Sequence, residues 1–146
     1  MREIEFRGKS LVTNNWVYGN YIIDKWGDDN NEIIYGILRD RTAPSSLQNW
    51  IPVRVDGETI GQFTGIKDKN GTKIYEGDIV KYEDDSGYPS YDVFVNVGVV
   101  EYCGNAFWVS NRNRVDMQDL VYDAEGIMEC EVIGNIHDNK LEEFYE

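Results

Sequence analysis

The chain has 146 residues, with 14 basic and 27 acidic side chains, a formal net charge of −13 and a hydrophobic content of 41%. This composition suits one globular domain or two small subdomains, and it excludes wholesale disorder, collagen-like repeats and a disulfide-stapled mini-protein. A membrane-spanning helix needs roughly 20 apolar residues in succession. No such run occurs, so we expect no membrane partner.

The N-terminal residues and the cysteines indicate a cellular setting. Residues 1–7 read MREIEFR, in which acids interrupt the apolar positions, unlike a secretory signal. Cys103 and Cys130 are the only cysteines. Because we expect a reducing cytoplasm, we predict two free, buried thiols.

The charge is concentrated in one half of the chain. Residues 1–73 contain ten basic and ten acidic side chains, whereas residues 74–146 contain four basic and seventeen acidic ones. Such an excess of acid repels phosphate backbones, which disfavours nucleic-acid binding through the C-terminal half. The excess of acid has two possible explanations. It keeps the protein soluble, or it forms an acidic face that mimics DNA and binds a basic protein.

In the first half of the chain, short runs of alternating or β-branched residues predict strands. These runs cover residues 4–6, 16–23 and 33–38. In the segment 51–55, apolar residues alternate around Pro52, and because proline cannot donate a backbone hydrogen bond, we predict an edge strand or an extended connector there. Gly19 and Asn20 interrupt the second run, which predicts either two short strands or one kinked strand. We place exposed loops at residues 28–31 and 42–49.

In the second half, turn residues separate the predicted strands more clearly. Residues 68–71 join strands over 60–66 and 74–82, residues 84–89 form a loop, and a hairpin through Gly104 and Asn105 joins 91–103 to 107–109. Gly98 predicts a bulge or bend. A helical turn capped by Asp116 and Asp119, a strand over 129–136 and a short helix opened by Asn139 and Glu142 complete the chain.

These elements predict an all-β fold. We expect a small N-terminal β subdomain over residues 1–58, packed on a C-terminal SH3-like β-barrel over residues 59–146 that ends in a short helix. Closure into a barrel would remove exposed strand edges.

One central block is more specific than this general pattern. It comprises residues 59–71 (TIGQFTGIKDKNG) and 73–80 (KIYEGDIV), flanked by REIEFR at 2–7, WVYG at 16–19 and EVIGNI at 131–136. In this order the segments closely resemble the YopX family, small β-rich proteins encoded by phages, prophages and plasmids of bacteria. The resemblance implies a bacterial cytoplasmic setting, and it supplies no established activity and no functional residues.

Within the block, the residues that change the chain's direction are predicted to have a structural role. Asp68, Asn70 and Gly71 fit the turn, because Asn and Gly tolerate positive φ. Gly77 and Asp78 fit the next turn, where an aspartate usually accepts hydrogen bonds from nearby backbone amides.

No motif anchors an enzyme. The EF-hand spacing fails around both Asp28 and Asp68, and the two cysteines lack zinc-site spacing. His137, the only histidine, fits a structural role, and phosphate-binding glycine loops are absent. We therefore predict a non-enzymatic protein without cofactor or metal, although a small carboxylate-dependent enzyme stays open as an alternative.

Aromatic residues in polar segments provide the better indication of function. We predict an interaction patch that mixes aromatic and cationic side chains: Trp26, Arg39, Arg41, Trp50, Arg54, Tyr88 and Tyr91. The function we expect is that of a phage or prophage accessory protein that binds another protein or itself. The alternatives are an acidic nucleic-acid mimic that inhibits a basic host protein, and nucleic-acid binding through Arg39, Arg41 and Arg54.

Overall fold

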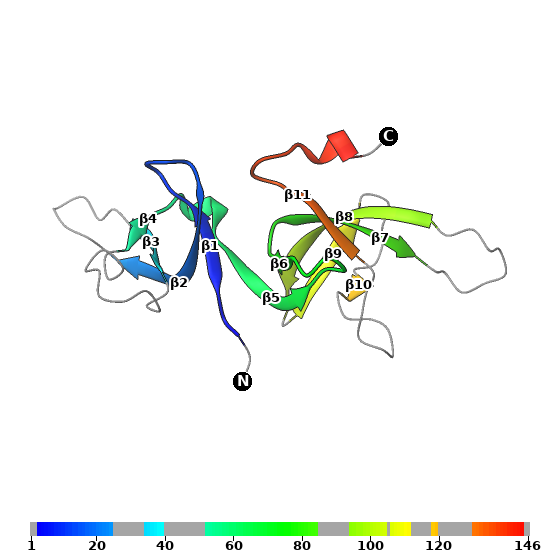
Figure 1. The fold of residues 1–146 in the computed structure, drawn as a ribbon, viewed down its shortest axis with the longest axis horizontal. Coiled ribbons are helices and arrows are strands. Elements are labelled where there is room, and N and C mark those ends of the chain that lie inside the picture. The colour runs from blue at the N-terminus through cyan, green and yellow to red at the C-terminus, as the bar shows by residue number, and fades with distance from the viewer. Residues whose placement is uncertain are drawn as a thin grey trace. The chain divides into compact units, whose positions relative to one another are not determined.

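The computed structural model describes residues 3–24, 34–39, 52–84, 94–104, 106–111, 118–119 and 130–144 (Figure 1). Their regular structure consists of strands in two antiparallel sheets and short 3-10 helices, which confirms the predicted all-β class. None of the helices in these residues is long and apolar enough to span a membrane. The chain divides into unit 1, Met1–Phe63, and unit 2, Thr64–Glu146.

The described residues of unit 1 form the strands β1 (Phe6–Lys9), β2 (Trp16–Asp24), β3 (Ile34–Arg39) and β4 (Val53–Arg54), the 3-10 helix η2 (Gly57–Thr59) and the start of β5 (Gly61–Lys67). The six-stranded sheet has the order β4-β3-β2-β1-β5-β6, in which β6 (Lys73–Tyr75) belongs to unit 2. The segment around Gly19 and Asn20 is one continuous strand, β2, and the proline-led β4 lies at the sheet edge as expected.

The core of unit 1 lies on one face of this sheet. Val17, Ile37 and Val55 are buried there, and Tyr21 and Tyr35 pack against them. The two tyrosine rings stack with centroids 6.3 Å apart. Alternate positions of β2 and β3 thus form the core, as the period-two pattern predicts.

The expected boundary after residue 58 falls inside η2, whereas the division of the chain comes after Phe63. The reason is the start of β5, in which Gly61 and Gln62 pair with β1. The backbone N–H of Phe63 also donates to the carbonyl of Glu5 at 2.7 Å.

Unit 2 continues β5 and holds the second sheet. Its elements are β5 (Gly61–Lys67), β6 (Lys73–Tyr75), β7 (Asp78–Asp84), β8 (Phe94–Cys103), β9 (Ala106–Asn111), β10 (Gln118–Asp119), β11 (Cys130–Asn135) and η3 (Leu141–Phe144). The five-stranded sheet has the order β10-β9-β8-β7-β11. An SH3-like barrel stays a prediction.

The core of unit 2 gathers residues from both sheets. Its buried members come from β6, β7, β8, β9 and β11: Ile74, Val80, Tyr82, Val100, Val109 and Cys130. The cysteine belongs to this core, whereas Cys103 is exposed, which corrects the prediction of two buried thiols. Cys103 is exposed because it ends β8 at the tip of the β8–β9 hairpin.

Gly98 is not the site of a bulge. Its register with Val80 and Asn111 is continuous, and the irregularity lies in β11 between Val132 and Gly134. A Cβ atom at Gly98 would lie 2.4 Å from Cγ1 of Val109. The close approach in the core therefore explains the glycine at this position.

Two predicted helix caps are also corrected. Asp119 lies in strand β10 opposite Trp108, because pairing with β9 sets its conformation; Asp116 lies outside the described residues. The side-chain oxygen of Asn139 accepts from the backbone N–H of Asn135 at 3.3 Å instead of opening a capping box, and the final helix is the 3-10 helix η3.

Candidate functional site

Most of the predicted interaction patch lies outside the described residues, namely Trp26, Arg41, Trp50, Tyr88 and Tyr91. Arg39 ends β3, and Arg54 lies in the adjacent β4, where it is exposed. The carbonyl of Arg54 accepts from Leu11 N–H at 3.1 Å. These two strands are neighbours, and the patch as a whole stays a prediction.

Unit 1 instead contains a different group of cationic and aromatic side chains, on β1 and β2. The guanidinium carbon of Arg7 lies 4.4 Å from the ring centroid of Trp16, and Lys9 Nζ lies 5.5 Å from it. Arg7 is buried, so its guanidinium group belongs to the packed part of the molecule. Both cations lie within cation–π range of the ring, and the arrangement stabilises this pair of strands.

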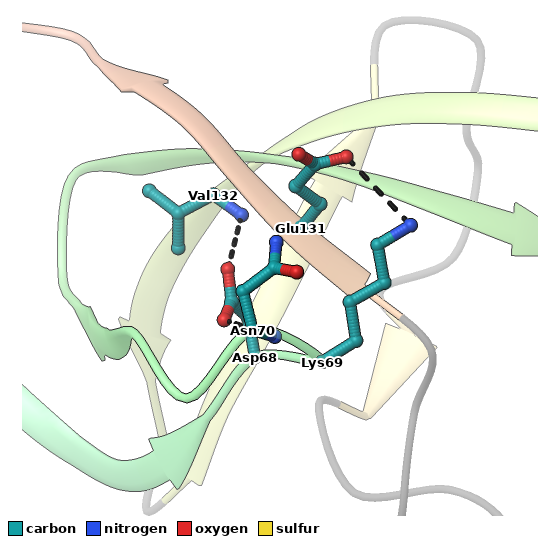
Figure 2. Close-up of polar contacts among 5 residues, drawn as sticks. All are labelled: Asp68, Lys69, Asn70, Glu131 and Val132. Atoms are coloured by element: carbon teal, nitrogen blue, oxygen red, sulfur yellow. Dashed lines mark hydrogen bonds and ion pairs between the residues drawn. The ribbon is translucent and has the colours of Figure 1, made fainter.

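The turn between β5 and β6 is built around the buried carboxylate of Asp68 (Figure 2). Its Oδ1 accepts from the backbone N–H groups of Asn70 and Thr72, each at 2.9 Å. Gly71 completes the turn with φ of +81°. The carboxylate therefore satisfies amides that the reversal of the chain leaves without strand partners.

The same turn also covers the outer edge of β11. Asp68 Oδ2 accepts from Val132 N–H at 3.0 Å, and Lys69 N–H donates to the carbonyl of Cys130 at 3.0 Å. Outside these bonds, Lys69 Nζ lies 3.7 Å from Glu131 Oε2 on the surface (Figure 2). The turn thus takes the place of a further strand on part of an exposed sheet edge.

Burial and hydrogen bonding act in opposite directions on Asp68. Burial raises the pKa of Asp68, and the hydrogen bonds from Val132, Thr72 and Asn70 lower it. The hydrogen bonds together outweigh burial, so the pKa of Asp68 is held below its ordinary value of 3.8. The pKa of the Cys130 thiol is raised, first by burial and then by the charge of Asp68. The ionised carboxylate and the neutral thiol suit a structural role.

The turn between β6 and β7 also makes its hydrogen bonds to the packed part of the molecule. Asp78 is buried, and its Oδ2 accepts from Tyr75 N–H at 2.8 Å. Gly77, with φ of +85°, donates its N–H to Val100 and accepts from Ile136 N–H. A Cβ atom at Gly77 would lie 3.4 Å from Nε2 of His137, which places the histidine against this turn.

Among the described residues of unit 2, an exposed aromatic group lies at the β8–β9 hairpin end, which comprises residues 101–103 and 106–108. Cys103 pairs with Ala106, so the connecting loop has the predicted two residues. Tyr102, which is 53% exposed, meets Phe107 edge-on with ring centroids 5.1 Å apart. On the other face of the same strands, Glu101 lies opposite Trp108.

Sequence reasoning did not identify this hairpin end as a candidate site. Counting outward from the predicted two-residue loop pairs residue 103 with 106, 102 with 107 and 101 with 108. That count was available from the sequence, and it would have placed the aromatic pair on one face and the Glu–Trp pair on the other.

Within the described part of the chain, no three His, Cys, Asp or Glu side chains form a group that would hold a metal ion. The aromatic and acidic hairpin end is thus the candidate site with the clearest chemistry for binding.

Comparisons with known proteins agree with this β-rich architecture. The crystal structure of protein EF1440 from Enterococcus faecalis is similar, with a TM-score of 0.51 and 25% sequence identity over 100% of both chains. No curated protein matches the chain. The family model described as YopX protein matches residues 5–142. Since this match spans nearly the whole sequence, the chain belongs to the YopX protein family.

Proposed function

We propose that this YopX protein is a non-enzymatic accessory protein of phages or prophages that acts in the bacterial cytoplasm by binding another protein or a second copy of itself. The observation that supports this proposal is the β8–β9 hairpin end. It holds Tyr102 and Phe107 in an edge-on contact, and Tyr102 is more than half exposed.

Aromatic side chains in such a position favour protein contacts. Tyrosine and tryptophan offer a large contact area with little conformational entropy to lose, and they are enriched at the energetic centres of interfaces. The β8–β9 pairing is continuous from Gly98 to Cys103, which holds the hairpin end in one conformation before a partner arrives.

The alternative function, a nucleic-acid mimic that inhibits a basic host protein, is favoured by the charge of residues 74–146, where seventeen acidic side chains accompany four basic ones. A mimic of this kind loses its affinity steeply as salt rises, because charge attraction supplies most of the binding. A hairpin end that binds through aromatic contacts keeps most of its affinity.

The test is affinity capture from bacteria that carry the encoding phage or prophage, with wild type, Tyr102→Ser and Tyr18→Ser as baits. Tyr18 is 46% exposed and lies in unit 1, so its variant is a matched loss of one exposed ring. We expect wild type and Tyr18→Ser to retain the same protein and Tyr102→Ser to lose it. Equal retention by all three baits would refute the hairpin end as the binding surface.

A further inference from the structure

The turn between β5 and β6 contains an asparagine that is followed by a glycine, Asn70–Gly71, and the sequence holds no other such pair. Figure 2 shows Asn70 in this turn beside Asp68. An asparagine side chain is open to attack by the backbone nitrogen of the next residue. Glycine favours this reaction, because it has no Cβ atom to hinder the approach and its backbone turns freely. The pair is therefore the position of the sequence most suited to spontaneous deamidation.

The group that would be attacked is the side-chain amide of Asn70. This residue and Gly71 are both exposed. The backbone N–H of Asn70 donates to Asp68 Oδ1, whereas its side-chain amide makes no hydrogen bond to any residue that the structure describes. A Cβ atom at Gly71 would meet no other atom within 4 Å. Within the described chain, neither a hydrogen bond nor a neighbouring side chain protects the amide.

The attacking nitrogen, in contrast, is engaged by the turn. Gly71 N–H donates to the carbonyl of Asp68 at 2.9 Å. On either side of it, the N–H groups of Asn70 and Thr72 donate to Asp68 Oδ1, each at 2.9 Å. Attack requires that Gly71 lose its amide proton and that the peptide group rotate toward Asn70. Both changes break bonds that Asp68 makes, so the reaction has to wait for the turn to open.

The reaction needs no reagent other than water. The deprotonated nitrogen of Gly71 forms a bond to Cγ of Asn70, the bond from Cγ to Nδ2 breaks, and the leaving nitrogen takes up a proton and departs as ammonia. The product is a cyclic imide. Water then adds to one of its two carbonyl groups, which gives aspartate or isoaspartate at position 70. No electron is transferred in either step.

We propose that Asn70–Gly71 is a site of spontaneous deamidation that reacts through local opening of the turn, and that Asp68 is the positioning residue that sets the rate. This inference is independent of the proposed binding function. It assigns the buried carboxylate a second consequence, because the bonds that hold the turn closed also delay the covalent change.

The isoaspartate product would loosen the link between the turn and β11. Isoaspartate carries the main chain through the former side chain, which adds a methylene group between positions 70 and 71. The bonds from Gly71 and Thr72 to Asp68 span this point and lose their geometry. Since the same carboxylate accepts from Val132 N–H, we expect the isoaspartate form, separated by ion exchange, to melt at a lower temperature than the unmodified chain.

The first test uses the full-length wild type. Its deamidation at Asn70 is followed by peptide mapping, in native buffer and in guanidinium chloride, and NMR measures hydrogen exchange of Gly71 N–H in the native state. Both reactions need the same open turn, so we expect the protection against deamidation to match the protection against exchange within about threefold. A native chain that reacts as fast as the unfolded chain, or at a rate that exchange does not predict, would overturn the proposal.

The second test separates opening of the turn from unfolding of unit 2. The native rate of each variant is divided by the rate of the same variant in guanidinium chloride. We expect Asp68→Asn to raise this ratio at least about fivefold, since it loses the charge-assisted bonds that close the turn.

The matched control is Gly98→Ala, which overpacks the core at Val109 and leaves the bonds of the turn in place. We expect it to change the ratio by less than about twofold. Equal acceleration by the two variants would show that the reaction proceeds through unfolding of the unit and would overturn the role of Asp68. If Asp68→Asn does not fold, the comparison of deamidation with hydrogen exchange in the wild type decides the question by itself.

Discussion

Asp68 joins two segments that are 64 residues apart along the chain. Its carboxylate accepts backbone N–H groups from its own turn and from β11, and only 7% of the residue is exposed. A buried acceptor with three charge-assisted bonds contributes more to stability than a surface ion pair. Asp68 is therefore the single residue on which we expect the closure of unit 2 to depend most.

The variant Asp68→Asn tests this role. The amide can keep the Oδ1 bonds to Asn70 and Thr72, but it sets an N–H donor against Val132 N–H, so we expect a loss of about 1–3 kcal/mol in the free energy of unfolding. Urea denaturation measures the loss. Glu131→Gln, which removes only the surface pair with Lys69, is the control and is expected to cost less than about 1 kcal/mol.

The lowered pKa of Asp68 gives its contribution a defined pH range. A carboxyl whose folded pKa is below the unfolded value stabilises the fold above the unfolded value and loses that effect as pH falls through the folded one. The stability difference between wild type and Asp68→Asn should thus be constant near neutral pH and shrink below about pH 3.8. A difference that grew on acidification would contradict this assignment.

At the scale of the strands, the close approach of β8 and β9 explains Gly98. A Cβ atom there meets Cγ1 of Val109 at 2.4 Å and the carbonyl oxygen of Ser110 at 2.9 Å. We expect Gly98→Ala to lower the free energy of unfolding by about 1–3 kcal/mol, since overpacking outweighs the smaller entropy of the unfolded chain.

A double-mutant cycle checks this explanation. In a Val109→Ala background the nearest clash is gone, so Gly98→Ala should cost less there than in the wild type. Strictly additive losses in urea denaturation would show that the Val109 side chain is not the obstacle.

Local chemistry explains which strands and turns were predictable. The turn at Asp68 and Gly71 and the two-residue loop after Cys103 follow from residues that favour chain reversal, wherever the rest of the chain lies. Asp119 was assigned to a cap because its short polar side chain suits one, but pairing with β9 determines its structure. The link from Asp68 to Val132 depends on a distant segment, which turn chemistry does not reveal.

The candidate site shows the same limit. The predicted patch was chosen from aromatic and cationic residues that are near one another in sequence, whereas the residues of the β8–β9 hairpin end are brought together by strand register. Register across β10 could not be read from the sequence, because residues 112–117 separate it from β9.

For the molecule as a whole, YopX membership and the all-β fold are established, and binding is the proposed activity. The charge is carried by the C-terminal half, which also holds the hairpin end. Unit 1 presents a competing surface, since Leu11 and Val12 are 64% and 88% exposed in the turn between β1 and β2. A partner that binds the hairpin end would lie next to Tyr102, whereas a partner that binds the turn of unit 1 would lie next to Val12.

Site-specific photo-crosslinking in phage- or prophage-bearing cells decides between them. A benzophenone side chain is placed at Tyr102 in one variant and at Val12 in another, and the crosslinked products are separated by mass. We predict one discrete adduct from position 102 and none from position 12. A discrete adduct from position 12 with none from position 102 would contradict the assignment of binding to the β8–β9 hairpin end.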